Sequence, residues 1–251
     1  MTVKYDDREA IAHGKITTKP LRERPSAPSW ALKLIMAITG IIFGLFVFVH
    51  MIGNLKIFLP DTDGVNHLNE YAAFLREFGE PMLPYGSFLW AFRIVLLVCL
   101  IAHIYSAFAL HGRGQKSRGK FRRTGLMGGL NSFSARTMLV TGIVLLLFII
   151  FHLLDLTIGA QPAATAVFEH GEAYANVLAS FDRPIVAIFY ILAMVILFFH
   201  LSHGLWTAVS DLGITGKRWR SVLLFVSYLI PAAVLVGNAL IPIAVLAGWL
   251  S

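Results

Sequence analysis

Five apolar segments, each more than 20 residues long, run through this chain of 251 residues. An α-helix rises about 1.5 Å per residue, so about 20 apolar residues cross the roughly 30 Å hydrocarbon core of a bilayer. Because lipid offers the backbone no hydrogen-bond partners, a single spanning segment has to be helical. We therefore predict an all-α integral membrane protein with five transmembrane helices. The predicted spans are residues 30–59, 86–110, 137–159, 185–209 and 222–249.

The composition supports this class of protein. Hydrophobic residues make up 57% of the chain and charged residues only 14%, and the mean hydropathy is +0.72. Such a chain is too apolar for an ordinary soluble domain. Residues 1–29 are polar, contain three prolines and lack the apolar run of a cleavable signal. We expect a cytoplasmic N-terminal arm at 1–29 and one membrane domain at 30–251.

Lysine and arginine are distributed unevenly between the two faces of the predicted bundle. They concentrate in the N-terminal arm and in the second and fourth connections, whereas the other connections are mainly acidic. Basic loops stay on the cytoplasmic side of a membrane. We therefore expect a multi-pass protein of the cell inner membrane, with its N-terminus in the cytoplasm and its C-terminus outside. The net charge is +7, and the basic residues responsible for it are concentrated in loops at one face. This distribution argues against nucleic-acid binding and favours anionic membrane lipids as partners.

Four histidines lie deep inside four successive apolar segments, each about two-thirds of the way along its span. They are His50, His103, His152 and His200. An imidazole that faces hydrocarbon loses its hydrogen bonds to water, so an intramembrane histidine normally faces the helix bundle and has a partner there. Four such residues indicate a shared function inside the bundle.

Consecutive spans run in opposite directions, which sorts these histidines by depth. His50 and His152 fall in the outer leaflet and form the outer pair, whereas His103 and His200 fall near the cytoplasmic third and form the inner pair. The rise per residue places the two pairs about 10 to 15 Å apart along the membrane normal. Two imidazoles from different helices can hold a haem edge-on in a bundle core. The pattern predicts a four-helix haem-binding bundle with two bis-histidine haems and a peripheral fifth helix.

Other interpretations of the histidines remain open. Four unrelated histidines could each make an interhelical hydrogen bond worth about 1 kcal/mol. His203, three residues after His200, could be the ligand in its place, or could hydrogen-bond a haem propionate or a quinone. The single cysteine, Cys99, excludes an iron–sulfur cluster held by cysteines of one chain.

Recognisable motifs surround all four histidines. They are Gly40 to His50 followed by Asn54, Ile101 to Tyr105, Thr141-Gly142 leading to Phe151-His152 and Asp155, and Phe199 to Trp206 continuing to Asp211. These motifs resemble the single-chain dihaem cytochrome b membrane-anchor subunit of succinate:quinone oxidoreductases, the succinate dehydrogenases and fumarate reductases of respiratory complex II. The similarity extends from the first to the fifth span, and the stretch that begins at Phe199 is the most specific.

The resemblance implies an electron-transfer role for the chain. It places a proximal haem b on the inner pair, near a cytoplasmic iron–sulfur subunit, and a distal haem b on the outer pair. It also implies two partners, a flavoprotein that oxidises succinate in the tricarboxylic acid cycle and an iron–sulfur protein that relays electrons to this anchor. This chain would then pass electrons through both haems to membrane quinone, without catalysing succinate oxidation itself. The quinone, menaquinone or ubiquinone, and the direction of the reaction stay open.

Several polar residues near the histidines are candidates for quinone or proton contacts. Asp155, one turn after the outer-pair ligand of its helix, is a candidate for a distal proton route or, alternatively, an interfacial anchor exposed to water. Tyr105, His203 and Trp206 lie near the inner pair and are candidates for framing a quinone. Aromatic residues are expected at membrane interfaces in any case.

Two arginines at the inner ends of the spans, Arg113 and Arg136, are candidates for contacts with haem propionates. Both also contribute to the basic face that sets the topology, and this is the alternative explanation of their position. The sequence does not separate the two roles.

Three other functions remain open. A dihaem cytochrome b of another membrane dehydrogenase, such as a hydrogenase or a formate dehydrogenase, would use the same ligands and would be distinguished by its copurified subunits. A haem-free transporter that uses the histidines as a relay would lack haem absorption. A purely structural anchor would leave the matched depths of the four histidines unexplained.

Overall fold

The computed structural model describes residues 27–61, 64–118, 130–214 and 216–250, with side chains in the same ranges except 118 and 130–136. The elements in these ranges are all helices, and the predicted all-α class is confirmed. Most of the predicted N-terminal arm, residues 1–26, lies outside the described residues.

Within the described ranges, five long helices alternate with shorter ones. The long helices are α2 (Ser29–Asn54), α4 (Ser87–Arg118), α5 (Leu130–Leu153), α7 (Pro184–Asp211) and α8 (Lys217–Leu246). The short ones are the 3-10 helix η1 (Leu55–Phe58), α3 (His67–Glu77), the π-helix η2 (Leu154–Ile158) and α6 (Ala173–Phe181). Five segments of this part of the chain are long and apolar enough to cross a membrane, which confirms the predicted multi-pass architecture.

Three helices extend well beyond the predicted spans. The second span was predicted to end at residue 110, whereas α4 continues to Arg118. Helix α5 begins at Leu130 rather than at 137, and α8 begins at Lys217 rather than at 222. Hydropathy ends a span where side chains become polar, but Lys, Arg and Gln are good helix formers and let the backbone continue. Pro231 and Pro242 lie inside α8, where packing against neighbouring helices makes such residues tolerable in a membrane span.

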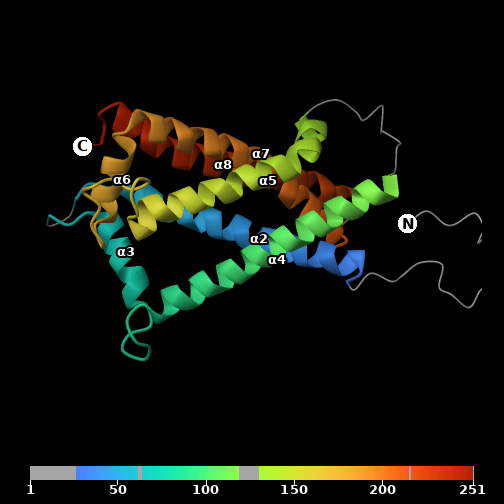
Figure 1. The fold of residues 1–251 in the computed structure, drawn as a ribbon, viewed down its shortest axis with the longest axis horizontal. Coiled ribbons are helices and arrows are strands. Elements are labelled where there is room, and N and C mark those ends of the chain that lie inside the picture. Colours follow the sequence, from blue (N-terminus) through green and yellow to red (C-terminus); the bar gives the residue numbers. More distant parts are fainter. Residues whose placement is uncertain (1–26, 62–63, 119–129, 215, 251) are drawn as a thin grey trace, which may run out of the picture.

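The long helices run side by side, and the short helices gather at one end (Figure 1). The start of α2 lies at the opposite end from α3, α6 and the end of α8. The predicted orientation places the end with α3 and α6 outside the cell, and we call it the outer end. Helices α2, α5 and α8 run toward it, whereas α4 and α7 run away from it.

Helix α7 is the centre of the bundle and packs against α8, α2 and α5, whereas α4 packs mainly along α2. None of the residues in the apolar core of α4 is buried by the protein, so this span presents most of its surface to lipid. Helix α8 contains no histidine and lies beside α7 and α2. It is well packed, because Gly237 leaves room for the side chain of Met51 on α2.

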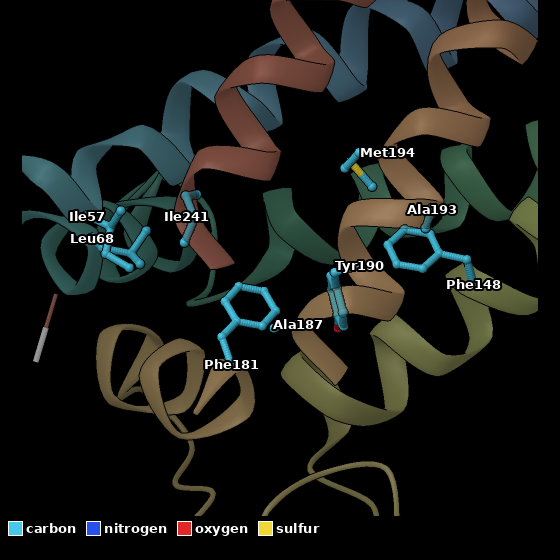
Figure 2. Packing of buried hydrophobic residues seen from close by; sticks show 9 residues of the cluster. All are labelled: Ile57, Leu68, Phe148, Phe181, Ala187, Tyr190, Ala193, Met194 and Ile241. Atoms are coloured by element: carbon cyan, nitrogen blue, oxygen red, sulfur yellow. The ribbon is translucent and has the colours of Figure 1, made fainter. Parts of the chain in front are cut away.

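The short helices close the outer end of the bundle. Asn69 of α3 donates a hydrogen bond to Glu172 (2.8 Å) and accepts one from the backbone N–H of Tyr174 at the start of α6 (2.9 Å). Beneath them lies a cluster of buried residues drawn from six elements (Figure 2). Its members are Ile57, Leu68, Phe148, Phe181, Ala187, Tyr190, Ala193, Met194 and Ile241.

Candidate functional site

The outer pair comes together inside the bundle. His50 projects from α2 and His152 from α5, and their ring centroids lie 5.9 Å apart with the ring planes at 84°. Metal–nitrogen bonds of about 2.0 Å place two trans imidazoles of one iron at a centroid separation of about 6 Å. The observed separation of the outer pair fits a bis-histidine haem.

A phenylalanine one turn earlier supports each ring of the outer pair. Phe46 stacks on His50 with a centroid distance of 5.3 Å and an interplanar angle of 24°, and Phe148 stacks on His152 at 5.8 Å and 26°. Residues four apart lie on the same face of a helix, so each ring is held by its own helix. Both imidazoles are therefore oriented before any cofactor binds.

Each histidine of the inner pair contacts a threonine on the neighbouring helix. His103 Nδ1 lies 2.9 Å from Thr39 Oγ1, and His200 Nδ1 lies 3.0 Å from Thr141 Oγ1. Both threonine hydroxyls donate to backbone carbonyls of the preceding turn, Thr39 to Ile35 (2.7 Å) and Thr141 to Met138 (3.0 Å) and Thr137 (3.1 Å). The hydroxyl oxygens must therefore accept from Nδ1–H. This tautomer leaves Nε2 of both histidines with a free lone pair, as metal ligation requires.

A glycine beside each threonine makes room for the inner-pair rings. A Cβ atom at Gly40 would lie 3.6 Å from Cε1 of His103, and one at Gly142 would lie 3.4 Å from Cε1 of His200. A methyl group at either position would therefore lie in van der Waals contact with the imidazole. Among the described residues, no cluster of three or more metal-ligating side chains occurs.

The two halves of the bundle repeat one sequence pattern. Helices α2 and α5 carry identical residues at six positions, and the spacing between these positions is the same in both helices. These are Thr39, Gly40, Ile41, Leu45, Phe46 and His50 in α2, and Thr141, Gly142, Ile143, Leu147, Phe148 and His152 in α5. Since eleven residues separate the threonine from the histidine in both helices, the inner and outer pairs are about 16 Å apart along the helices. This value lies just beyond the predicted range of separations.

The partner helices α4 and α7 follow the same rule. Phe92 precedes His103 by eleven residues, and Phe189 precedes His200 by eleven. Phe92 contacts Phe46 at 5.8 Å and Phe189 contacts Phe148 at 5.9 Å, both with an interplanar angle of 55°. The α2–α4 and α5–α7 hairpins therefore present their histidines in matching positions.

Comparison with known proteins agrees with these motifs. Residues 114–237 match the family described as succinate dehydrogenase/fumarate reductase transmembrane subunit. Over this range the chain is similar to these membrane subunits. The succinate dehydrogenase cytochrome b558 subunit of Bacillus subtilis (strain 168) is 38% identical over 76 residues, which cover 30% of this chain and 35% of that protein. No solved structure matches the chain. The resemblance expected from the sequence is confirmed.

The candidate proton-route residue Asp155 is buried, with 1% of its surface exposed. Its carboxylate accepts hydrogen bonds from Ser180 Oγ (2.6 Å), Tyr190 OH (2.9 Å) and Arg183 Nη2 (2.9 Å). The alternative of an anchor exposed to water is therefore wrong. A buried carboxylate persists only with such partners, and the turn of π-helix at η2 carries Asp155 into their reach.

The candidates near the inner pair lie in different environments. Tyr105 is 60% exposed and faces away from the bundle, whereas Trp206 carries the guanidinium of Arg220 over its ring at 5.2 Å. Nδ1 of His203 is buried and has no hydrogen-bond partner among the described residues, as is also true of two hydroxyls close to the inner pair in sequence. These hydroxyls belong to Ser106 and Ser202. Of the three predicted quinone candidates, His203 has the unused polar atom.

Of the two arginines predicted to contact haem propionates, the structure describes the side chain of one. Arg113 donates to Ser29 Oγ (3.0 Å) and to the backbone carbonyl of Ala27 (2.7 Å), so it ties the end of α4 to the start of α2. The side chain of Arg136 lies outside the described residues. Close to Arg113 in the fold, Lys33 pairs with Asp211 at 3.1 Å and links the inner ends of α2 and α7.

The residues that contact the candidate histidines and Asp155 were not predicted from the sequence. Thr39 and Thr141 contact histidines 64 and 59 positions away, and Tyr190 contacts Asp155 across 35 positions. A signal for the threonines was present, because the Thr-Gly-Ile triplet recurs eleven residues before a histidine in two spans. No comparable signal marks Tyr190, whose role depends on the packing of α7 against α5.

Proposed function

We propose that this chain is the haem-bearing membrane anchor of a succinate dehydrogenase or fumarate reductase complex. The observation that carries the proposal is the outer pair, whose ring centroids lie 5.9 Å apart, a separation at which both imidazoles could bind one haem iron. The threonine-bound tautomers of the inner pair support it. Membership of such a complex is suggested by the family match, and the relative from Bacillus subtilis is by its name a cytochrome b558 subunit.

Two b haems would be bound, one by His50 and His152 and one by His103 and His200. Each haem supplies a one-electron carrier within the hydrocarbon core, where no protein side chain offers one. The residues of this chain hold and orient the two sites, and the phenylalanines around the outer pair exclude water from it. A separation of about 16 Å along the helices is compatible with electron transfer between the sites.

In the proposed orientation the protein lies in the inner membrane of the cell, and the inner pair lies on the cytoplasmic side of that membrane. Basic side chains gather at that end of the bundle. Among the described residues they are Lys33, Arg113, Lys116, Lys217, Arg218 and Arg220. They would face anionic lipids and the proposed iron–sulfur subunit, which in turn binds the flavoprotein that oxidises succinate. Electrons would then travel from the inner pair to the outer pair, or to a quinone beside either.

For the quinone or a haem carboxylate near the inner pair, His203 is the best placed of the predicted residues. Its buried Nδ1 has no partner among the described residues, and burial of an unsatisfied polar atom is costly. A carboxylate or carbonyl oxygen placed there would satisfy it. Asp155 is instead held by three donors, which favours a fixed charge over a mobile proton carrier.

The test is a reduced-minus-oxidised spectrum of the purified chain together with a pyridine haemochrome assay. We expect a b-type spectrum and two haems per polypeptide. A colourless protein would contradict the proposal and favour the haem-free alternatives. Subunits that copurify decide the complex, because a flavoprotein with succinate-oxidising activity belongs to succinate dehydrogenase, and its replacement by a hydrogenase or formate dehydrogenase subunit would point to those enzymes.

A further inference from the structure

The outer pair differs from the inner pair in what lies behind one of its rings. Nδ1 of His152 faces the hydroxyl of Tyr190 at 3.4 Å, and this hydroxyl donates its hydrogen to Asp155 Oδ2 at 2.9 Å. Because the hydrogen of Tyr190 is committed to a carboxylate, its oxygen can only accept from Nδ1–H of His152. The three side chains therefore form one directed chain that ends on a negative charge.

The carboxylate is fixed in place by its other partners. Arg183 Nη2 binds Oδ1 at 2.9 Å, and Ser180 Oγ donates to Oδ2 at 2.6 Å. Arg183 also donates to the backbone carbonyl of Ala163 (2.8 Å), and its side chain is 31% exposed at the outer end. The guanidinium is therefore on the solvent side of the network, whereas Tyr190 points toward the histidine.

Among the described residues, the inner pair has no such chain. Behind His103 and His200 the threonine hydroxyls donate to backbone carbonyls, which are neutral. A hydroxyl that donates to a carboxylate is a stronger acceptor than one that donates to a neutral carbonyl, because hydrogen bonds in a chain polarise one another. It draws the Nδ1 proton more strongly, which gives the imidazole more imidazolate character and makes Nε2 a stronger electron donor. A stronger donor favours the oxidised, more positively charged iron.

We propose that Tyr190 is a positioning residue through which Asp155 lowers the reduction potential of the outer haem relative to that of the inner haem. This inference rests on the proposed function, since it requires a haem on His50 and His152. The two sites have identical histidine ligands, so the expected difference in reduction potential would arise from the Tyr190 hydroxyl and the Asp155 carboxylate behind it.

The replacement Tyr190→Phe tests this assignment directly. The ring is packed by Phe181 (4.9 Å between centroids) and Phe148 (5.2 Å), and a phenylalanine keeps these contacts while it removes the hydroxyl. Redox titration of the purified protein, followed optically, measures both midpoint potentials, and His152→Ala identifies the signal of the outer haem. We expect the midpoint potential of the outer haem to become more positive by about 59 mV. For a one-electron carrier, this shift corresponds to an approximately tenfold change in the oxidised-to-reduced ratio at a given potential.

Asp155→Asn is measured in parallel, because it removes the charge but keeps a group that can accept from Tyr190. It should shift the outer potential in the same direction and leave the inner potential unchanged. Tyr85→Phe is the matched control, since that tyrosine is 63% exposed at the outer end, and it should move neither potential. Thr39→Val should instead affect the inner haem alone.

Two results overturn the inference. One is an unchanged outer potential in a Tyr190→Phe protein that still binds two haems, and the other is an equal shift of both haems. Neither affects the proposed function, which fails separately if the unmodified chain binds no haem. A positive shift confined to the outer haem in both Tyr190→Phe and Asp155→Asn supports the inference.

Discussion

The first half of the bundle, α2 with α4, and the second half, α5 with α7, are alike at the inner end and different at the outer end. Both halves hold an inner histidine on a threonine that is followed by glycine. At the outer end, Asp155 lies in η2, three residues after the histidine of α5, and the residue three positions after the histidine of α2 is Gly53. The Tyr71 ring of α3 occupies the space beside Gly53.

The repeated residues therefore hold the histidines, whereas the residues beyond them at the outer end differ between the two halves. Gly53 in α2 lets α3 lie close. Asp155 in η2 instead accepts hydrogen bonds from Tyr190, Ser180 and Arg183. Two halves that present the same ligands can therefore place them in different electrostatic surroundings. The following predictions are ways to test how far the likeness extends.

The largest effect is expected from the histidines, because the proposal pairs residues across the two halves. His50→Ala and His152→Ala should each remove the same haem signal, and His103→Ala and His200→Ala should each remove the other. Haem content and low-temperature optical spectra of each variant measure this. Loss of different signals from His50→Ala and His152→Ala would show that each half binds its own haem.

Next in size is the loss of the carboxylate that distinguishes the second half. In Asp155→Ala, the partly buried Arg183 loses its ion pair and Tyr190 loses its acceptor, so we expect a destabilisation of about 3–5 kcal/mol. A marked fall in the apparent melting temperature in detergent checks this. A melting temperature equal to that of the unmodified protein would mean that water or lipid replaces the carboxylate without cost.

The threonines test the likeness of the halves. Thr39→Val and Thr141→Val each remove one hydrogen bond to an inner histidine, which costs about 1 kcal/mol and weakens binding of a ligated metal about 10-fold or more. The rate of haem loss from the inner site should rise similarly in both variants. If only one of the two variants accelerates haem loss, the inner ligands are not held equivalently.

The smallest effect is expected at the inner surface. Lys33 is 53% exposed and pairs with Asp211, so Lys33→Ala should change stability by less than about 1 kcal/mol. The melting temperature in detergent should stay within a few degrees of the original at low salt and at high salt. A fall as large as that of Asp155→Ala would show that this ion pair, which joins α2 to α7, is shielded from solvent by a partner or by lipid.

Much of the architecture follows from the order of residues. Hydropathy alone predicts the five spans, because the cost of burying polar backbone and side chains in lipid acts on every segment separately. The depth of each histidine is also readable, since an α-helix converts residue number into distance at a constant rise. For this reason the matching of His50 with His152 in depth was predictable, and the structure places their ring centroids 5.9 Å apart.

Tertiary packing alone determined which side chains of neighbouring helices contact one another. Depth says nothing of the rotation of a helix or of its neighbours, so the contacts of Thr39 with His103 and of Tyr190 with Asp155 could not be derived from spacing. The burial of Asp155 has the same origin. An acidic residue near a membrane boundary is expected to face water, and it became buried because α6 and α7 bring three hydrogen-bond donors to the place where η2 turns it inward.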